Sequence, residues 1–211
     1  MTTAFFGGSF DPPHRGHLAV ARGALASGVC DHVMWVPAFA PPHKLNFQRA
    51  PFELRMEMVS MLISHERAMS VSDIERRISK TPSYTIDILE FIEAEQGIRP
   101  ALLIGADSLK ELHTWHRSRE LAEKYAIYCY PRKNYCVSQE VLKDFWGDKM
   151  AEKLLSGIIP GKFFEISSTK IRNSMEKSPL TGNIKGETEL PDEITAFIQA
   201  HNLYGTTNEN E

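Results

Sequence analysis

Two histidines three residues apart, His14 and His17, follow the glycine pair Gly7-Gly8 near the start of this 211-residue chain. Glycines let a backbone approach an anion closely, and the free N–H groups at a helix start point toward it. The apolar spacing after His17 predicts such a helix, and an i, i+3 spacing can aim both rings the same way. Each residue alone is compatible with an ordinary surface turn, but the whole stretch predicts a phosphate-binding turn.

A second group of polar residues lies near the other end of the chain. Ser167, Ser168 and Thr169 place hydroxyls at the start of a predicted helix, with Arg172 one turn further on. Hydroxyl residues at this position are ordinary helix caps. A helix N-terminus with hydroxyls also holds phosphate, and a guanidinium can neutralise it. A third candidate is Asp107, an acidic residue just after the end of a predicted strand.

The elements that must position these residues alternate between strands and helices, which predicts an α/β fold with a doubly wound, mostly parallel sheet. A first short strand precedes the pair Gly7-Gly8. Further strands are expected at 32–37, 101–104, 126–130 and 163–166, and a strand or extended segment at 69–74. After the helix that follows His17, helices are expected around 52–63, from 83, up to 125, and at 140–155, 168–176 and 191–201. In the helix around 52–63, the residues expected to share one face are Phe52, Met56, Val59 and Ile63.

The three polar motifs all follow the ends of predicted strands. In a doubly wound sheet, ligands bind beyond the carboxyl ends of the strands, at the point where the connections switch faces. We therefore expect the three motifs to line one crevice. The chain predicts a single domain over residues 1–204, followed by a polar, disordered tail at 205–211.

Composition narrows the possible classes of protein. Apolar residues make up 42% of the chain and charged residues 24%, which suits a globular domain, and the net charge of −3 argues against general nucleic-acid binding. Three cysteines fit no zinc spacing and no disulfide framework, which predicts reduced thiols in a cytoplasmic protein. The chain shows no pattern of a signal peptide or membrane span, and it does not indicate an oligomeric state.

The motifs carry a family resemblance. The string Gly8-Ser9-Phe10-Asp11-Pro12, followed by His14-Arg15-Gly16-His17, resembles the HxGH signature of the nucleotidyltransferase superfamily. Residues 166–172 resemble its second signature. Further motifs narrow the resemblance to bacterial nicotinate-nucleotide adenylyltransferases: Pro42-His43-Lys44, Ser83-Tyr84-Thr85, Gly105-Ala106-Asp107, Trp115 and Tyr130-Pro131-Arg132. The chain departs from the family at Ile88, where a threonine is usual, and it lacks the glycine often found after Arg132.

The resemblance implies a Rossmann-like fold, ATP and nicotinate mononucleotide as substrates, and a role for each motif. Catalytic roles fall to His14, His17, Lys44 and Arg172. The implied ATP-binding residues are Gly7, Gly8, Ser9, Phe10, Gly105, Asp107, Ile166, Ser167, Ser168 and Thr169. The implied residues for the nicotinate nucleotide are Ser9, Tyr84, Thr85, Trp115 and Arg132.

The implied reaction is adenylyl transfer with release of pyrophosphate, and Mg²⁺ is expected to bind mainly through the ATP phosphates. The histidine pair His113 and His116 has no third ligand nearby in sequence, so no protein metal site is predicted. Three alternatives stay open: transfer to nicotinamide mononucleotide, transfer to phosphopantetheine, and a nucleotide-binding regulator without turnover. A nucleic-acid-binding module is the weakest reading.

Overall fold

The structure is a computed structural model that describes residues 1–39, 49–78, 80, 82–131, 137–160, 166–177 and 189–205. Its centre is a five-stranded sheet in the order β3-β2-β1-β4-β5, and every pair of neighbouring strands is parallel. The strands are β1 (Thr3–Gly8), β2 (His32–Pro37), β3 (Met69–Val71), β4 (Ala101–Gly105) and β5 (Ile127–Tyr130). The predicted doubly wound parallel sheet is confirmed.

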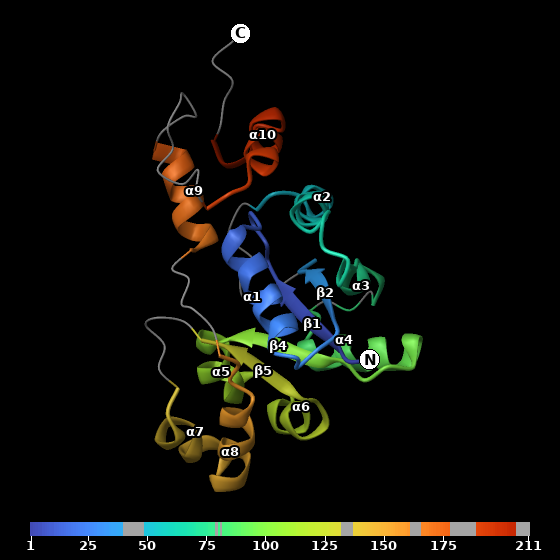
Figure 1. Ribbon diagram of the computed structural model, residues 1–211, viewed down its shortest axis with the longest axis vertical. Helices are drawn as coiled ribbons and strands as arrows, with labels where there is room; N and C mark the ends of the chain where they lie inside the picture. The colour runs from blue at the N-terminus through green and yellow to red at the C-terminus, as the bar shows by residue number, and fades with distance from the viewer. Residues whose placement is uncertain are drawn as a thin grey trace.

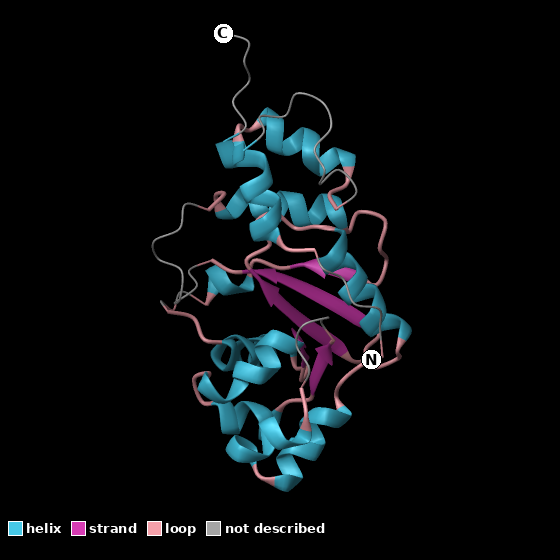
Figure 2. Ribbon diagram, turned by 90° about the vertical axis from the view of Figure 1, so that its left-hand side faces the viewer, coloured by secondary structure: helices cyan, strands magenta, loops and turns pink. Residues whose placement is uncertain are grey.

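Helices cover both faces of this sheet, which lies between two groups of them (Figure 2). The core on one face includes buried residues of α1 (Arg15–Ala26), α2 (Phe52–Leu62), α9 (Ser168–Lys177) and α10 (Asp192–Ala200). The core on the other face is built from α3 (Ile74–Arg77), α4 (Thr85–Gln96), α5 (Ala106–Glu111), the 3₁₀ turn η1 (Leu112–Thr114), α6 (Ser118–Lys124), α7 (Gln139–Trp146) and α8 (Asp148–Ser156). Among the described residues, no helix combines the length and the apolar character needed to cross a lipid bilayer.

Strand residues alternate between the two cores, which explains why the strands read as continuous apolar runs. In β2, Val33 and Trp35 join one core, and Met34 and Val36 join the other. Successive side chains of a strand point to opposite faces, so a strand covered on both faces needs apolar residues at every position.

The order in which strands are added to the sheet reverses between β1 and β4. From β1 it proceeds through β2 to β3 at one edge, and then returns to add β4 and β5 on the other side of β1. Figure 1 shows α1 in front of the sheet and α9 and α10 together beyond its upper end. The switch point therefore lies at the carboxyl ends of β1 and β4.

Three details of the predicted elements are wrong. The strand or extended segment expected at 69–74 is a strand only up to Val71, and Ile74 already begins α3. The single helix expected at 140–155 is two helices, α7 and α8, which meet at Gly147 with a φ of 73°. A right-handed helix cannot continue through that conformation, which glycine adopts without a Cβ clash. In α2, the core-facing residues include Arg55 and Met58, whereas Met56 is half-buried.

Two predicted segments, the strand at 163–166 and the tail at 205–211, are only partly described. Of the strand expected at 163–166, residues 163–165 lie outside the described residues, and Ile166 lies in a loop. Of the predicted tail, Gly205 ends the 3₁₀ turn η2 (Leu203–Gly205), and 206–211 lie outside the described residues.

Candidate active site

A cavity of about 900 Å³ opens at the switch point. All the implied ATP-binding residues line it, together with His14, His17 and Arg172. They come from the β1–α1 connection, the end of β4 with the start of α5, and the start of α9. The expectation that the three motifs share one crevice is confirmed.

The two histidines cap the N-terminus of α1 for each other. The backbone N–H of His17 donates to Nδ1 of His14, and the backbone N–H of His14 donates to Nδ1 of His17, both at 3.3 Å. The rings stack with centroids 3.7 Å apart. Because each Nδ1 accepts a hydrogen bond, the proton of a neutral ring resides on Nε2. The cap thus fixes which nitrogen of each ring acts as the donor.

The buried ring of Phe10 supports the glycine-rich turn from the core side. Its backbone has a φ of 46°, which is unfavourable for a residue with a Cβ. Its ring is buried and makes edge contacts with Phe6 at 5.4 Å and His17 at 5.1 Å between centroids. This apolar packing offsets the backbone cost and supports the histidine from the core side.

Gly16 lies between the histidines because a side chain there has no room. A Cβ at Gly16 would lie 3.0 Å from Nδ1 of His14 and 3.1 Å from Cβ of Ile166. Contacts this short require the neighbours to move. The glycine of the first signature therefore lets the second signature pack directly against the histidine pair.

The start of α9 is tied to the β1–α1 connection by side chains. The hydroxyl of Ser168 donates to the carbonyl oxygen of Pro12 at 2.9 Å. Arg172 donates to the carbonyl oxygen of Asp11 at 2.5 Å, and its other terminal nitrogen donates to Oγ1 of Thr169 at 3.3 Å. These bonds hold a guanidinium and a helix N-terminus at the same cavity as the histidines.

The lining of the cavity also includes Asp107, Ser108 and Trp115. Trp115 follows η1 and is half-buried. His116, the next residue, stacks on Tyr84 with centroids 4.2 Å apart. Tyr84 and Thr85 themselves do not line the cavity within the described part of the chain, so their contact with a substrate stays a prediction.

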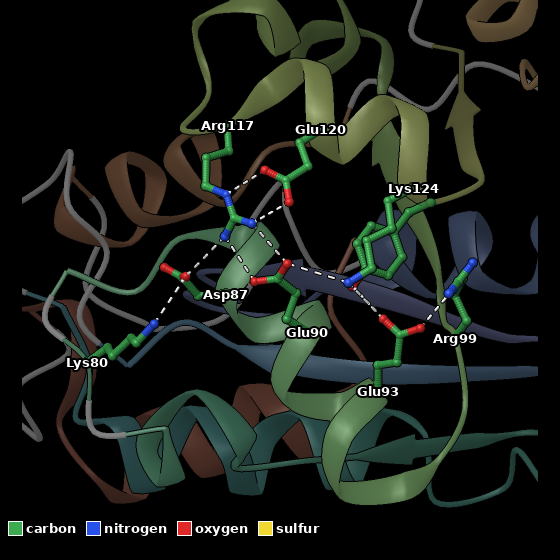
Figure 3. Close-up of polar contacts among 9 residues, drawn as sticks. Lys80, Asp87, Glu90, Glu93, Arg99, Arg117, Glu120 and Lys124 are labelled. Atoms are coloured by element: carbon green, nitrogen blue, oxygen red, sulfur yellow. Dashed lines mark hydrogen bonds and ion pairs between the residues drawn. The ribbon is translucent and has the colours of Figure 1, made fainter.

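Arg117 stabilises the turn that carries Trp115. Its backbone is left-handed, with a φ of 51°, and its guanidinium makes paired bonds of 2.9 and 3.0 Å to the carboxylate of Glu90 on α4. The same guanidinium also contacts Glu120 on α6, and Lys124 extends the network (Figure 3). Such a network joins α4 to α6 and fixes the turn that leads from Trp115 into α6.

Sequence reasoning missed several residues at this site. Arg49 lines the cavity but belongs to no motif, and it follows residues 40–48, which lie outside the described residues. Arg55 is 3% exposed and donates to the carbonyl oxygens of Ser9, Ala38 and Ala50 at 2.8 to 3.0 Å. In the sequence, the only indication that Arg55 has a special role is its position on the predicted apolar face of α2. Of the predicted site residues, Lys44 and Arg132 lie outside the described residues.

Comparison with known proteins agrees with this geometry. The chain belongs to the cytidylyltransferase-like family, whose model matches residues 5–174. Its relatives include proteins named "probable nicotinate-nucleotide adenylyltransferase". That of Desulfotalea psychrophila is 32% identical over 94% of this chain and 97% of its own, and that of Gloeobacter violaceus is 35% identical over 94% of each. The resemblance to nicotinate-nucleotide adenylyltransferases found in the sequence is thus confirmed.

The fold also matches solved structures. A Plasmodium falciparum nicotinic acid mononucleotide adenylyltransferase complexed with NaAD superposes with a TM-score of 0.75 over 98% of both chains, at 17% identity. The same protein complexed with APC superposes with a TM-score of 0.74. At this identity the likeness establishes the fold.

Proposed function

We propose that this protein transfers the adenylyl group of ATP to nicotinate mononucleotide, giving nicotinate adenine dinucleotide and pyrophosphate in NAD biosynthesis. The reciprocal cap of His14 and His17 carries the proposal, because it leaves Nε2 as the donor of each neutral ring and both histidines line the cavity that Arg172 also lines. The names of the relatives and of the matched structures support the choice of substrates.

The chemistry needs alignment and charge stabilisation more than a strong base. The attacking group is the phosphate of the mononucleotide, which is largely ionised near neutral pH because its second pKa is about 6. It attacks the α-phosphorus of ATP in line while the bond to pyrophosphate breaks. His14 and His17 donate from Nε2 to the oxygens of the α- and β-phosphates, and Arg172 neutralises the leaving pyrophosphate. Lys44 is proposed to share that last role.

The cavity suits a magnesium ion that arrives with ATP. Its lining offers oxygen atoms, among them the carboxylate of Asp107 and the hydroxyls of Ser167 and Thr169. Within the described residues, no group of three or more His, Cys, Asp or Glu side chains is placed to hold a metal ion. Mg²⁺ commonly binds through phosphates and water with few protein ligands, so this donor set fits it. The ion would neutralise charge on the phosphate oxygens.

The acceptor side of the cavity is proposed to discriminate the acid from the amide. Trp115 would stack on the flat pyridine ring, and the hydroxyl and N–H groups at Thr85 would receive its carboxylate. A pocket that offers donors to a carboxylate disfavours a carboxamide, because the amide presents donors of its own.

The test is pyrophosphate release by the purified protein with ATP and Mg²⁺, with nicotinate mononucleotide, nicotinamide mononucleotide and phosphopantetheine supplied in parallel. We expect a strong preference for the acid. Equal use of both mononucleotides would keep the chemistry and refute the carboxylate pocket. Release only with phosphopantetheine would replace the substrate, and ATP binding without release from any acceptor would favour a regulator.

A further inference from the structure

One buried carboxylate in the cavity lining, that of Asp11, contacts several distant segments of the chain. Asp11 is 2% exposed, and its Oδ1 accepts the hydroxyl of Tyr204 at 2.6 Å and the backbone N–H of Ala50 at 3.2 Å. Its Oδ2 lies 3.9 Å from Nη1 of Arg172, which also donates to the carbonyl oxygen of Asp11. Asp11 therefore links the end of the chain, the start of α2 and the arginine of α9.

The contact with Ala50 fixes the segment that presents a second cation. Ala50 is held on both sides, since its N–H bonds Asp11 and its carbonyl oxygen accepts Nε of Arg55 at 3.0 Å. The preceding residue, Arg49, lines the cavity. In the described part of the chain, the arginines that line the cavity are Arg49 and Arg172, and both are positioned through contacts of Asp11.

The hydroxyl of Tyr204 stays protonated and donates a hydrogen bond to the carboxylate of Asp11. Burial, together with the negative charge of Asp11, raises the pKa of the Tyr204 phenol far above its usual range, so the hydroxyl keeps its proton at any working pH. Its backbone lies in the left-handed region, with a φ of 58°, in η2. The residue comes from a turn that contributes nothing to the cavity lining in the described part of the chain.

We infer that Tyr204 is a positioning residue that acts through Asp11 to keep the carboxylate away from Arg172 and to fix the segment that carries Arg49, so that both arginines can bind the polyphosphate of ATP. The inference rests on the proposed function for the identity of that anion. The hydroxyl holds Oδ1, which keeps Oδ2 too far from Arg172 for a direct hydrogen bond. Without the hydroxyl, the carboxylate turns toward Arg172 and competes with phosphate for its guanidinium.

The main test is Tyr204→Phe, with Tyr125→Phe as the matched control. Tyr125 also donates its hydroxyl to a carboxylate, that of Glu93 at 3.1 Å, on α4 and away from the cavity. We expect Tyr204→Phe to weaken binding of inorganic pyrophosphate and of Mg–ATP about tenfold, measured by calorimetry, as for one lost hydrogen bond to a charged group. The KM for the acceptor should stay within about twofold, because neither Tyr204 nor Asp11 is among the residues proposed to bind the nicotinate nucleotide.

Asp11→Asn completes the cycle. It is also measured by itself, because Tyr204 stays in place if the phenylalanine variant folds poorly, and a tenfold loss of pyrophosphate affinity in Asp11→Asn alone would overturn the inference. The amide oxygen can still accept from Tyr204 but carries no charge to compete for Arg172, so adding Tyr204→Phe to Asp11→Asn should cause no further loss of pyrophosphate affinity. Unchanged pyrophosphate affinity in Tyr204→Phe, an equal loss in Tyr125→Phe, or additive losses in the double variant would each overturn the inference. Pyrophosphate binding needs no turnover, so failure of the proposed reaction would be recognised separately in the wild-type protein.

Discussion

Two substitutions at His17 separate its capping role from its proposed catalytic role. Asparagine can place an oxygen where Nδ1 lies, so His17→Asn keeps the acceptor for the His14 N–H and has nothing at the position of Nε2. Glutamine does the reverse. We expect His17→Asn to lose less than about 1 kcal/mol of stability, because a cap of this kind is typically worth about that much. Its kcat should fall about a hundredfold or more, the cost of one preorganised donor.

His17→Gln should show the opposite pattern, with a loss of about 1 kcal/mol of stability and a smaller loss of kcat. The assays are pyrophosphate release at saturating substrates and urea unfolding monitored by fluorescence. His201→Asn is the control, because His201 is an exposed histidine at the end of α10, outside the cavity. A kcat for His17→Asn within threefold of wild type would refute the role of Nε2, as would a His17→Gln variant no more active than His17→Asn.

Three further predictions concern packing and charge. Gly16→Ala should leave the protein folded but weaken ATP binding about tenfold, because its Cβ would displace the histidine pair; an unchanged calorimetric affinity would contradict this. Hydrogen bonds from Lys124 and then Arg99 lower the pKa of Glu93 to about 2, so this carboxylate stabilises the fold above pH 4.5 and its contribution is lost as the pH falls toward 2. The difference in unfolding free energy between wild type and Glu93→Gln should therefore disappear over that pH range. A constant difference in acid titrations would refute the assignment. Burial raises the pKa of the Cys129 thiol to about 12, so mass spectrometry should find it unalkylated at pH 8 until denaturant is added.

Local patterns in the sequence were sufficient for most of the fold. The strands β2 and β4 lie at the positions that the sequence predicted for them. Burial on a sheet face or a helix stripe imposes a period of its own on the residues, and that period is visible without the structure. The helix at 140–155 was wrong because its apolar period continues through Gly147, and only the backbone conformation there reveals the break.

The sequence by itself determined that the three motifs line one cavity, because parallel strands of a doubly wound sheet bring their carboxyl ends to one edge. Only the tertiary structure decided how those residues are held. The reciprocal histidine cap depends on ring orientation, Arg55 lies on an apolar face with no motif around it, and Tyr204 reaches Asp11 across 193 positions of the chain. Hydrogen bonds between distant segments leave no period or spacing in the sequence, since each partner alone is compatible with many surroundings. The packing that brings the partners together is what selects among them.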